Sequence, residues 1–411
     1  MTERLYYHDS FLYEFDATVI ETRAANAPDL RSAVVLDRTA FYPTSGGQVF
    51  DTGWIVPASD PRHKLRIEEV AESDDGTILH FVAGELPRQE GSRAHGAIDV
   101  DRRRDHMQQH SGQHVLSAAF VRLFEMPTVS FHMGAESCSI DLDAKNLTVA
   151  QVEAAEALAN DLISQDRRVD IRFVTREEAS SLGLRKLPPA EHEKLRLIDI
   201  QDFDLTACGG THVRSTGQIG CILLRKTEKV RQGWRVEFVC GKRAVATARR
   251  DFTMLTEAAG LCSGHIWELP QQVRKLLEES RAARKSREQL LEELADSHAV
   301  QLLAATPETG SRKVIVRSYA DRDLAFIKLL AQRLTRQNST AVALLASTSA
   351  PAALVFAQSA GQPFDMGALM KEALEQLGGR GGGSKDMAQG GPAKADQIEG
   401  VLAGLAAKLQ E

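Results

Sequence analysis

The sequence predicts an α+β protein built from four consecutive parts. We expect a small β-barrel at residues 1–90, a two-layer α+β domain at 91–250, a helical arm at 251–308 and a small α/β domain at 309–411. Three patterns carry this prediction: short β-type runs near the N-terminus, leucines near a heptad spacing in the third part, and strands alternating with helices in the fourth. A chain of 411 residues is long enough for two to four domains.

The first part is expected to be a barrel because its apolar runs are short and rich in β-branched residues. Turn-forming residues separate the runs, among them Pro43, Gly46 and the stretch 74–76. The runs lie at 17–20, 33–36 and 78–82.

The second part mixes helical and strand patterns, which indicates a two-layer arrangement. An amphipathic helix is predicted at 146–164, beginning near Thr148, and the segment 105–120 also has a helical pattern. Strands are predicted at 168–174, 220–224 and 235–240, the last two as buried strands.

The third and fourth parts differ in their hydrophobic period. Leucines among Glu, Arg and Lys in the third part are typical of an antiparallel or dimerising helical arm, so we expect a homodimer through this arm or the C-terminal domain. In the fourth part strands are predicted at 313–316, 341–345 and 353–356, and helices at 324–334, 366–377 and 393–409.

Bulk composition indicates a soluble cytoplasmic protein. The hydrophobic fraction is 43% and the charged fraction 26%, and the sequence has no apolar run of eighteen residues and no signal-peptide pattern. The five cysteines are odd in number and scattered, which argues against a disulfide framework. Because the net charge is −6, any contact with RNA must come from local basic patches such as 102–104 and 225–235.

A Cys-Gly-Gly-Thr-His motif at 208–212 is the strongest chemical signal in the chain. Its thiolate and imidazole are a zinc-type ligand pair, and the two glycines let the backbone fold tightly enough for both to face one ion. Two ligands do not complete a site, so further ligands are expected elsewhere in the chain.

Three histidines upstream can supply those ligands. His106, His110 and His114 are spaced by four residues on a predicted helix, where positions i and i+4 share one face. His106 and His114 would lie about 12 Å apart along the axis and cannot share an ion. One pair is therefore used, either His106 with His110 or His110 with His114.

These motifs resemble those of a known family. The segment His-Ser-Gly-Gln-His-Val-Leu-Ser at 110–117, followed by the motif at 208–212, resembles the editing domain of alanyl-tRNA synthetases, and still more the freestanding alanyl-tRNA editing proteins of the AlaX type. The segment Thr-Ala-Phe-Tyr-Pro-Thr-Ser-Gly-Gly-Gln at 39–48 is similar to the glycine-rich motif of that family's N-terminal domain. A glycine-rich run at 378–391 resembles the signature of its C-terminal DHHA1 domain.

The resemblance covers essentially the whole chain and implies a zinc-dependent editing domain at 91–250 and a DHHA1-like domain at 309–411. It implies that zinc is held by four residues, namely His110, His114, Cys208 and His212. The implied activity is a trans-editing hydrolase that deacylates mischarged tRNA(Ala), with Ser-tRNA(Ala) as substrate and Gly-tRNA(Ala) as a further one, the preference between the two left open. Only about forty residues precede the glycine-rich motif, so the resemblance implies no aminoacylation core.

The chemistry leaves alternatives open. Four protein ligands are typical of a structural zinc, whereas a catalytic zinc keeps one position open. Either one ligand is loose, the ion becomes five-coordinate, or zinc mainly positions the substrate. A non-catalytic zinc-stabilised RNA-binding module and a metal hydrolase of another ester therefore remain as alternative functions.

The resemblance also suggests roles for individual residues outside the ligand set. Thr39 would sense the hydroxyl of the serine substrate, although the residue type and position alone favour an ordinary threonine at the end of a strand. Gln48 would add a polar contact. His132 would take a catalytic or substrate-binding role, although a buried structural histidine is the other interpretation. Ser130 stands where the synthetases carry a functional glutamine, which leaves the acid–base partner open.

The glycine-rich run at 378–391 has two interpretations: a flexible linker, or a surface whose bare backbone approaches phosphates. The match to the family signature favours contact with tRNA. The expected contact residues are Arg380, Gly381, Gly382, Gly383 and Lys385.

Overall fold

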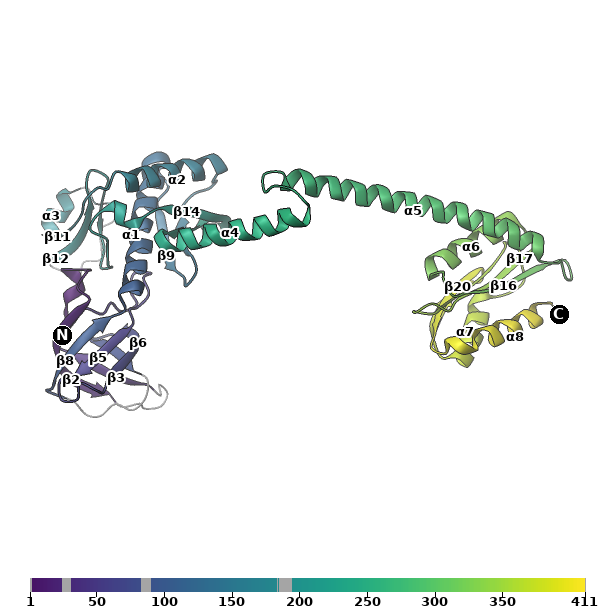
Figure 1. Cartoon of the computed structure of the whole chain (residues 1–411), viewed down its shortest axis with the longest axis horizontal. Coiled ribbons are helices and arrows are strands. Elements are labelled where there is room, and N and C mark those ends of the chain that lie inside the picture. The colour runs from purple at the N-terminus through teal and green to yellow at the C-terminus, as the bar shows by residue number, and fades with distance from the viewer. Residues whose placement is uncertain (1, 24–30, 83–89, 183, 185–193, 411) are drawn as a thin grey trace. The chain divides into compact units, whose positions relative to one another are not determined.

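The computed structural model describes residues 2–23, 31–82, 90–182, 184 and 194–410 (Figure 1). The chain forms two compact units, Met1–Glu257 and Ala258–Glu411, and each has its own hydrophobic cores. Among the described residues, no helix combines the length and the apolar character needed to cross a bilayer.

The predicted N-terminal barrel is confirmed as a closed barrel of antiparallel strands. Its neighbouring strands are, in order, β2 (Glu14–Arg23), β3 (Ser32–Leu36), β7 (Ile78–Val82), β6 (Leu65–Glu72), β5 (Gly53–Pro57) and β8 (Arg93–Ile98). Inward-facing side chains such as Ile55, Ile67 and Ile78 are fully buried in its core. Beside the barrel, β1 (Glu3–Arg4) pairs in parallel with β4 (Arg38–Thr39).

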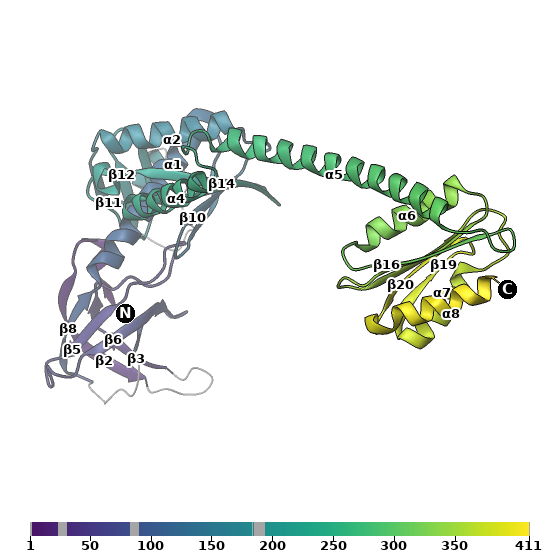
Figure 2. The ribbon, with the colours of Figure 1, turned by 45° about the vertical axis from the view of Figure 1, so that its right-hand side comes forward.

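Helix α1 (Val100–Phe124) follows β8 directly and runs from the barrel into the second part of the unit (Figures 1 and 2). Its first turns are tied to the barrel by a fully buried ion pair between Arg103 and Asp51, with Nη2 and Oδ2 2.5 Å apart. Arg103 also donates to the backbone oxygens of Ser10 and Ala40. This contact fixes the position of the segment 40–52 relative to the helix. We call this segment the glycine-rich loop, because it carries Gly46, Gly47 and Gln48 of the motif and, further on, Asp51.

The second part packs two sheets and two long helices around one core. One sheet has the strand order β14 (Ile222–Val230), β15 (Gly233–Cys240), β10 (Cys138–Leu142), β9 (Thr128–Met133), and the other has the order β11 (Val169–Thr175), β12 (Lys194–Ile200), β13 (Asp204–Ala207). Helix α2 (Val149–Ser164) begins with a capping box on Thr148, as predicted, and α3 (Arg176–Ser181) follows β11. The prediction that residues 220–224 form a buried strand is only partly right, because β14 is an edge strand in which Ile222 alone is buried.

Helix α4 (Gly241–Leu261) runs through the predicted boundary at residue 250, since the helical pattern begins immediately after β15. The long helix α5 (Leu269–Ala305) lies in the second unit. Leu276, Leu277 and Leu290 on α5 are exposed, whereas Ala295 and Ala299 are buried against the domain that follows. The division into four parts and the homodimer stay predictions.

The second unit contains a five-stranded sheet covered on both faces (Figure 2). The strand order is β16 (Lys313–Tyr319), β17 (Ala341–Ser347), β18 (Ala353–Gln358), β20 (Met387–Pro392), β19 (Gly379–Gly383). Alternate residues of β17 and β18 pack against α5 and α6 (Leu324–Gln337) on one face and against α7 (Met366–Leu377) and α8 (Ile398–Gln410) on the other. Every residue of these two central strands is therefore buried.

The glycine-rich run at 378–391 is a β-hairpin, so its interpretation as a linker is wrong. Strands β19 and β20 pair antiparallel, with Gly381 opposite Gly390. A Cβ at either glycine would lie 2.7 Å from Leu374 Cδ1 on α7, so bare backbone is needed for the helix to approach the hairpin. No heavy atom of the described residues lies within 4 Å of the Cβ position of Gly382, which faces open space.

Candidate metal centre

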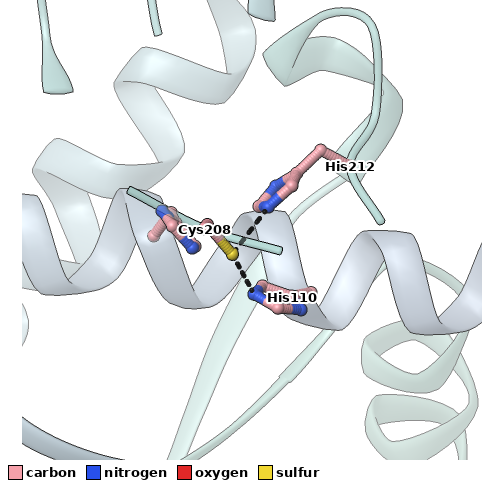
Figure 3. A group of neighbouring side chains, drawn as sticks. His110, Cys208 and His212 are labelled. Carbon is pink, nitrogen blue, oxygen red and sulfur yellow. Dashed lines mark hydrogen bonds between the residues drawn. The ribbon is translucent and has the colours of Figure 1, made fainter. Parts of the chain in front are cut away.

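The structure brings together the four predicted ligands and leaves His106 out. The ligand atoms of His110, His114, Cys208 and His212 all lie within 4.8 Å of one another. His110 and His114 lie one turn apart on α1, while Cys208 and His212 come from the loop after β13. Figure 3 shows the sulfur of Cys208 between the ring nitrogens of His110 and His212, at 3.3 and 3.4 Å from their Nε2 atoms.

This geometry fits zinc. Tetrahedral ligation with the usual zinc–nitrogen and zinc–sulfur bond lengths places ligand atoms ~3.3–3.6 Å apart, which matches the two sulfur–nitrogen distances. His114 Nδ1 is buried and has no hydrogen-bond partner among the described residues, although Asp204 Oδ2 lies 3.9 Å away. Four ligands of this kind, none of them fully exposed, form a donor set that zinc favours.

The electrostatics of the cluster favour a thiolate. Burial alone would raise the pKa of Cys208, but interaction of the thiolate with the neighbouring rings of His110, His212 and His114 lowers it well below its usual value. Burial lowers the pKa of His212 to about 3, so this imidazole is neutral and can bind a metal. At His114 burial acts in the same direction, yet the Cys208 thiolate and the Asp204 carboxylate raise the pKa to about 9. Binding of a metal at His114 therefore releases a proton.

The loop that carries Cys208 packs tightly against α1 at Gly210. A Cβ at this position would lie 2.2 Å from His110 Cε1 and 2.6 Å from His110 Nδ1. The neighbouring Gly209 is exposed, and its Cβ position lies 3.5 Å from the hydroxyl of Tyr7, which is ordinary contact. A side chain at Gly210 would therefore clash with His110, whereas a Cβ atom at Gly209 fits without a clash.

Gly210→Ala is expected to push the His110 ring out of the cluster and to lower zinc affinity at least tenfold, because displaced ligands cost affinity on the order of 10–100-fold. Gly209→Ala is the matched control and should leave zinc affinity within about twofold of wild type. Competition with a chromogenic zinc chelator measures both. Equal affinities in the two variants would mean that the close approach at Gly210 does not hold His110.

A cleft of about 390 Å³ opens beside the cluster. His110, His114 and Cys208 line one side, and Gly46 of the glycine-rich loop lines another. Further lining residues carry polar side chains or come from β9 and β13, namely Gln113, Thr128, Ser130, Phe131 and Thr206. Three of the four predicted ligands therefore face a space that can admit a substrate.

Sequence reasoning missed several residues that support the cluster. The Ser111 hydroxyl lies 3.2 Å from His212 Nδ1 and accepts from the backbone N–H of Val213. Asp204 lies beside His114. The position of Ser111 between the two histidine ligands in the sequence could have predicted its role. No sequence feature predicts Asp204, which is close to His114 only because β13 leads into the metal-binding loop.

The structure does not bring Thr39 to the cluster. Its Oγ1 lies 2.8 Å from His80 Nε2 and accepts from the backbone N–H of Phe41, and the side chain is fully buried. His80 Nδ1 lies 3.0 Å from the Val34 carbonyl, so Nδ1 carries the hydrogen and Nε2 accepts from Thr39. Burial lowers the pKa of His80 to about 4, which keeps this ring neutral. The Thr39 hydroxyl is thus fully engaged away from the cleft, and the geometry gives a role in sensing serine no support.

Thr39→Val is accordingly expected to act on stability. The variant leaves His80 Nε2 buried without its donor, which costs roughly 1–3 kcal/mol of unfolding free energy. Rates of hydrolysis of Ser-tRNA(Ala) and Gly-tRNA(Ala), the two substrates that the resemblance implies, should change by the same factor when they are measured side by side below the unfolding temperature. A loss confined to the serine substrate would instead restore the role in sensing the hydroxyl.

His132 also lies away from the cluster. Residues alternate between the two faces of β9, and Phe131, whose ring centroid is 5.5 Å from that of His110, faces the metal-binding side. His132 is exposed and lines a separate cavity together with Lys226 and Glu237. A catalytic role for His132 therefore gains no support from the geometry.

Gln48 does meet the cluster, through its side chain. The carboxamide is fully buried and contacts both His110 and Thr211 of the metal-binding motif. Gln48 is not among the residues that line the cleft. It therefore supports the ligand His110 from the side away from the cleft.

Three family models match the chain. Residues 195–236 match the threonyl and alanyl tRNA synthetase second additional domain, a range that includes Cys208 and His212. Residues 311–411 match the DHHA1 domain, and residues 3–102 match the model of class II (A) tRNA synthetases.

Curated relatives match over nearly the whole chain. The alanyl-tRNA editing protein AlaX-L of Pyrococcus horikoshii is 32% identical over 396 residues, covering 95% of this chain and 94% of that protein. The alanine–tRNA ligases of Archaeoglobus fulgidus and Pyrococcus furiosus are 32% and 31% identical, but the chain spans only 42% of each ligase. A solved structure, the C-Ala domain of alanyl-tRNA synthetase from Aquifex aeolicus, matches 26% of the chain with a TM-score of 0.24 and 21% identity.

Proposed function

The chain belongs to the family of alanyl-tRNA editing proteins, and we propose that it hydrolyses the ester bond of Ser-tRNA(Ala), and of Gly-tRNA(Ala), with the help of zinc. It is an aminoacyl-tRNA hydrolase that edits mischarged tRNA(Ala) in trans. The observation that carries the zinc proposal is the cluster of one cysteine and three histidines beside an open cleft.

His110, His114, Cys208 and His212 would hold the zinc ion. When bound, zinc would polarise the ester carbonyl or lower the pKa of a water molecule. The chain itself supplies a cleft that orients the aminoacyl end, and Gly46, Thr128 and Phe131 are among the residues that line it. Because the aminoacyl ester is already reactive, orientation is the larger part of the task.

The need for such an enzyme follows from the energetics of recognition. A synthetase site built for alanine cannot strongly reject serine, which adds only a hydroxyl, and glycine is smaller and fits inside. A second site that forms hydrogen bonds with the hydroxyl can separate serine from alanine. Gln113, Thr128 and Thr206 bring such polar groups to the cleft beside the cluster.

A second candidate function is a zinc-stabilised RNA-binding module without catalysis. The complete set of four protein ligands favours it, because structural zinc sites are closed. The cleft against three of those ligands favours the hydrolase.

Purified protein incubated with Ser-tRNA(Ala), Gly-tRNA(Ala) and Ala-tRNA(Ala) separates the two candidates. We expect Ser-tRNA(Ala) to be deacylated rapidly, Gly-tRNA(Ala) to be deacylated as well, and Ala-tRNA(Ala) to be spared. Release of the labelled amino acid measures each reaction. Binding of all three tRNAs without release above the spontaneous rate would favour the RNA-binding module.

For contact with tRNA we propose the hairpin of β19 and β20. Arg380 and Lys385 are exposed there, and the open space at Gly382 leaves room for a phosphate backbone. Gly381 and Gly383 continue the bare backbone of the same edge strand. Neither basic side chain forms an ion pair among the described residues.

Replacing both Arg380 and Lys385 with alanine is expected to weaken tRNA binding and to reduce the slope of log affinity against log salt by about two. The control removes the same charge from α6, by Lys328→Ala and Arg336→Ala, and should leave the slope within about half a unit. Binding titrations at several salt concentrations measure both. An equal change in the two double variants would reject a specific contact at the hairpin.

A further inference from the structure

We propose that Gln48 is a positioning residue, which orients the His110 ring for the metal and at the same time secures the loop that carries Cys208 and His212. The inference rests on the proposed zinc site and deepens it. It makes the glycine-rich loop beside the barrel a structural part of the metal centre, although no ligand comes from that loop.

The orientation of the Gln48 carboxamide is fixed by its contacts with Thr211. The backbone N–H of Thr211 can only donate, and it lies 3.0 Å from Gln48 Oε1. Gln48 Nε2 then donates to the hydroxyl of Thr211 at 2.8 Å. The two bonds identify the oxygen and the nitrogen of the amide unambiguously and attach the metal-binding motif to the side chain.

The same oxygen determines which nitrogen of His110 can bind a metal. His110 Nδ1 lies 2.7 Å from Gln48 Oε1, and an amide oxygen has no hydrogen to donate. Nδ1 must therefore carry the hydrogen, which leaves the lone pair on Nε2. Nε2 is the nitrogen that faces Cys208, 3.3 Å from its sulfur.

The surroundings hold Gln48 in this position. Its backbone closes a turn with Ser45, with N–H to O distances of 3.1 and 2.9 Å in the two directions. Gly47 takes a positive φ of 82°, and a Cβ there would lie 2.4 Å from the backbone oxygen of Phe131. The bare backbone of Gly210 leaves room on the other side, since its Cβ position lies 3.0 Å from Gln48 Oε1.

These contacts predict how the metal responds to changes at position 48. Partners that hold the second nitrogen of a metal-bound histidine contribute on the order of 10–100-fold to metal affinity. Gln48→Met keeps the volume but removes all three bonds, so zinc affinity should fall by that factor. Gln48→Glu keeps acceptors for His110 and for both donors of Thr211, and should stay within about threefold of wild type or bind more tightly.

A buried glutamine next to the ligand provides the control. Gln109 is also fully buried, and its carboxamide bonds to the backbone N–H and carbonyl of Cys240 at 2.8 and 3.0 Å, without touching a ligand. Gln109→Met should lose stability as Gln48→Met does, yet keep wild-type zinc affinity. This difference separates positioning of a ligand from the general cost of removing a buried amide.

Zinc affinity is measured by chelator competition on the full chain, with thermal unfolding of the metal-free proteins as the check on folding. If Gln48→Met does not fold, Gln48→Asn replaces it, because its amide is one methylene too short to reach His110. Wild-type zinc affinity in Gln48→Met, or in Gln48→Asn where it replaces that variant, would overturn the inference. An equal loss in Gln109→Met, or no zinc binding by the wild type, would overturn it as well. A Gln48-dependent zinc site in a protein that does not release serine would uphold it and reject only the proposed function.

Discussion

Cys208→Ala is expected to abolish zinc binding and to lower the rate of Ser-tRNA(Ala) hydrolysis by more than ~100-fold. Cys208 supplies the only sulfur of the four-residue cluster, and its thiolate lies within 3.4 Å of two ligand nitrogens. Loss of a residue that only orients a ligand costs up to about 100-fold, so loss of a ligand should cost more. Elemental analysis and single-turnover deacylation measure the two effects.

Cys221→Ala is the control for this variant. Cys221 is a free, half-buried cysteine in the same unit and does not belong to the cluster. The control should keep about one zinc ion per chain and wild-type hydrolysis. Retention of zinc by Cys208→Ala, or hydrolysis without zinc, would contradict the proposed role of the cluster.

Arg103→Met is expected to have the largest effect on stability. Arg103 and Asp51 are both fully buried, and the variant leaves the Asp51 carboxylate without its partner. Breaking a buried ion pair from one side costs about 3–5 kcal/mol. The first unit should therefore unfold at a much lower temperature, and zinc affinity should fall with it because Asp51 lies in the loop that also carries Gln48.

The neighbouring Arg104→Met provides the comparison. Arg104 is exposed and, within the described part of the chain, donates only to the hydroxyl of Tyr13, at 3.3 Å. Its replacement should change the unfolding free energy by no more than about 0.5 kcal/mol. Thermal unfolding followed by circular dichroism compares the two variants, and similar midpoints would mean that the buried pair does not hold α1 to the barrel.

The ligand set was predictable because each pair of ligands belongs to one short sequence motif. Histidines at i and i+4 on a helix and a Cys-Gly-Gly-Thr-His loop each bring two ligands together within a few residues. Spacing alone left the pair open between His106/His110 and His110/His114, and the resemblance to the family selected the second, which is the pair in the cluster.

The residues around the cluster were less predictable because their roles depend on the path of the chain. Thr39 and Gln48 belong to one motif, yet Thr39 bonds to His80 in the barrel while Gln48 reaches His110. His132 and Phe131 are neighbours on β9, so the period of a strand predicts that they lie on opposite faces. The period does not predict which of the two faces meets the metal.

Amino-acid composition alone could not predict that the glycine-rich run forms a hairpin. A run of glycines is typical of a linker, and nothing local distinguishes it from strands β19 and β20. The requirement for glycine at Gly381 and Gly390 comes from Leu374 on α7, which packs directly on the hairpin. Only the tertiary structure supplies that reason.

The most direct test of the account is to titrate zinc into metal-free protein while following release of serine from Ser-tRNA(Ala). We expect the rate of serine release to rise linearly with added zinc and to saturate at about one zinc ion per chain, while Ala-tRNA(Ala) is spared throughout. Full activity in the metal-free protein, or release of alanine as fast as serine, would contradict it.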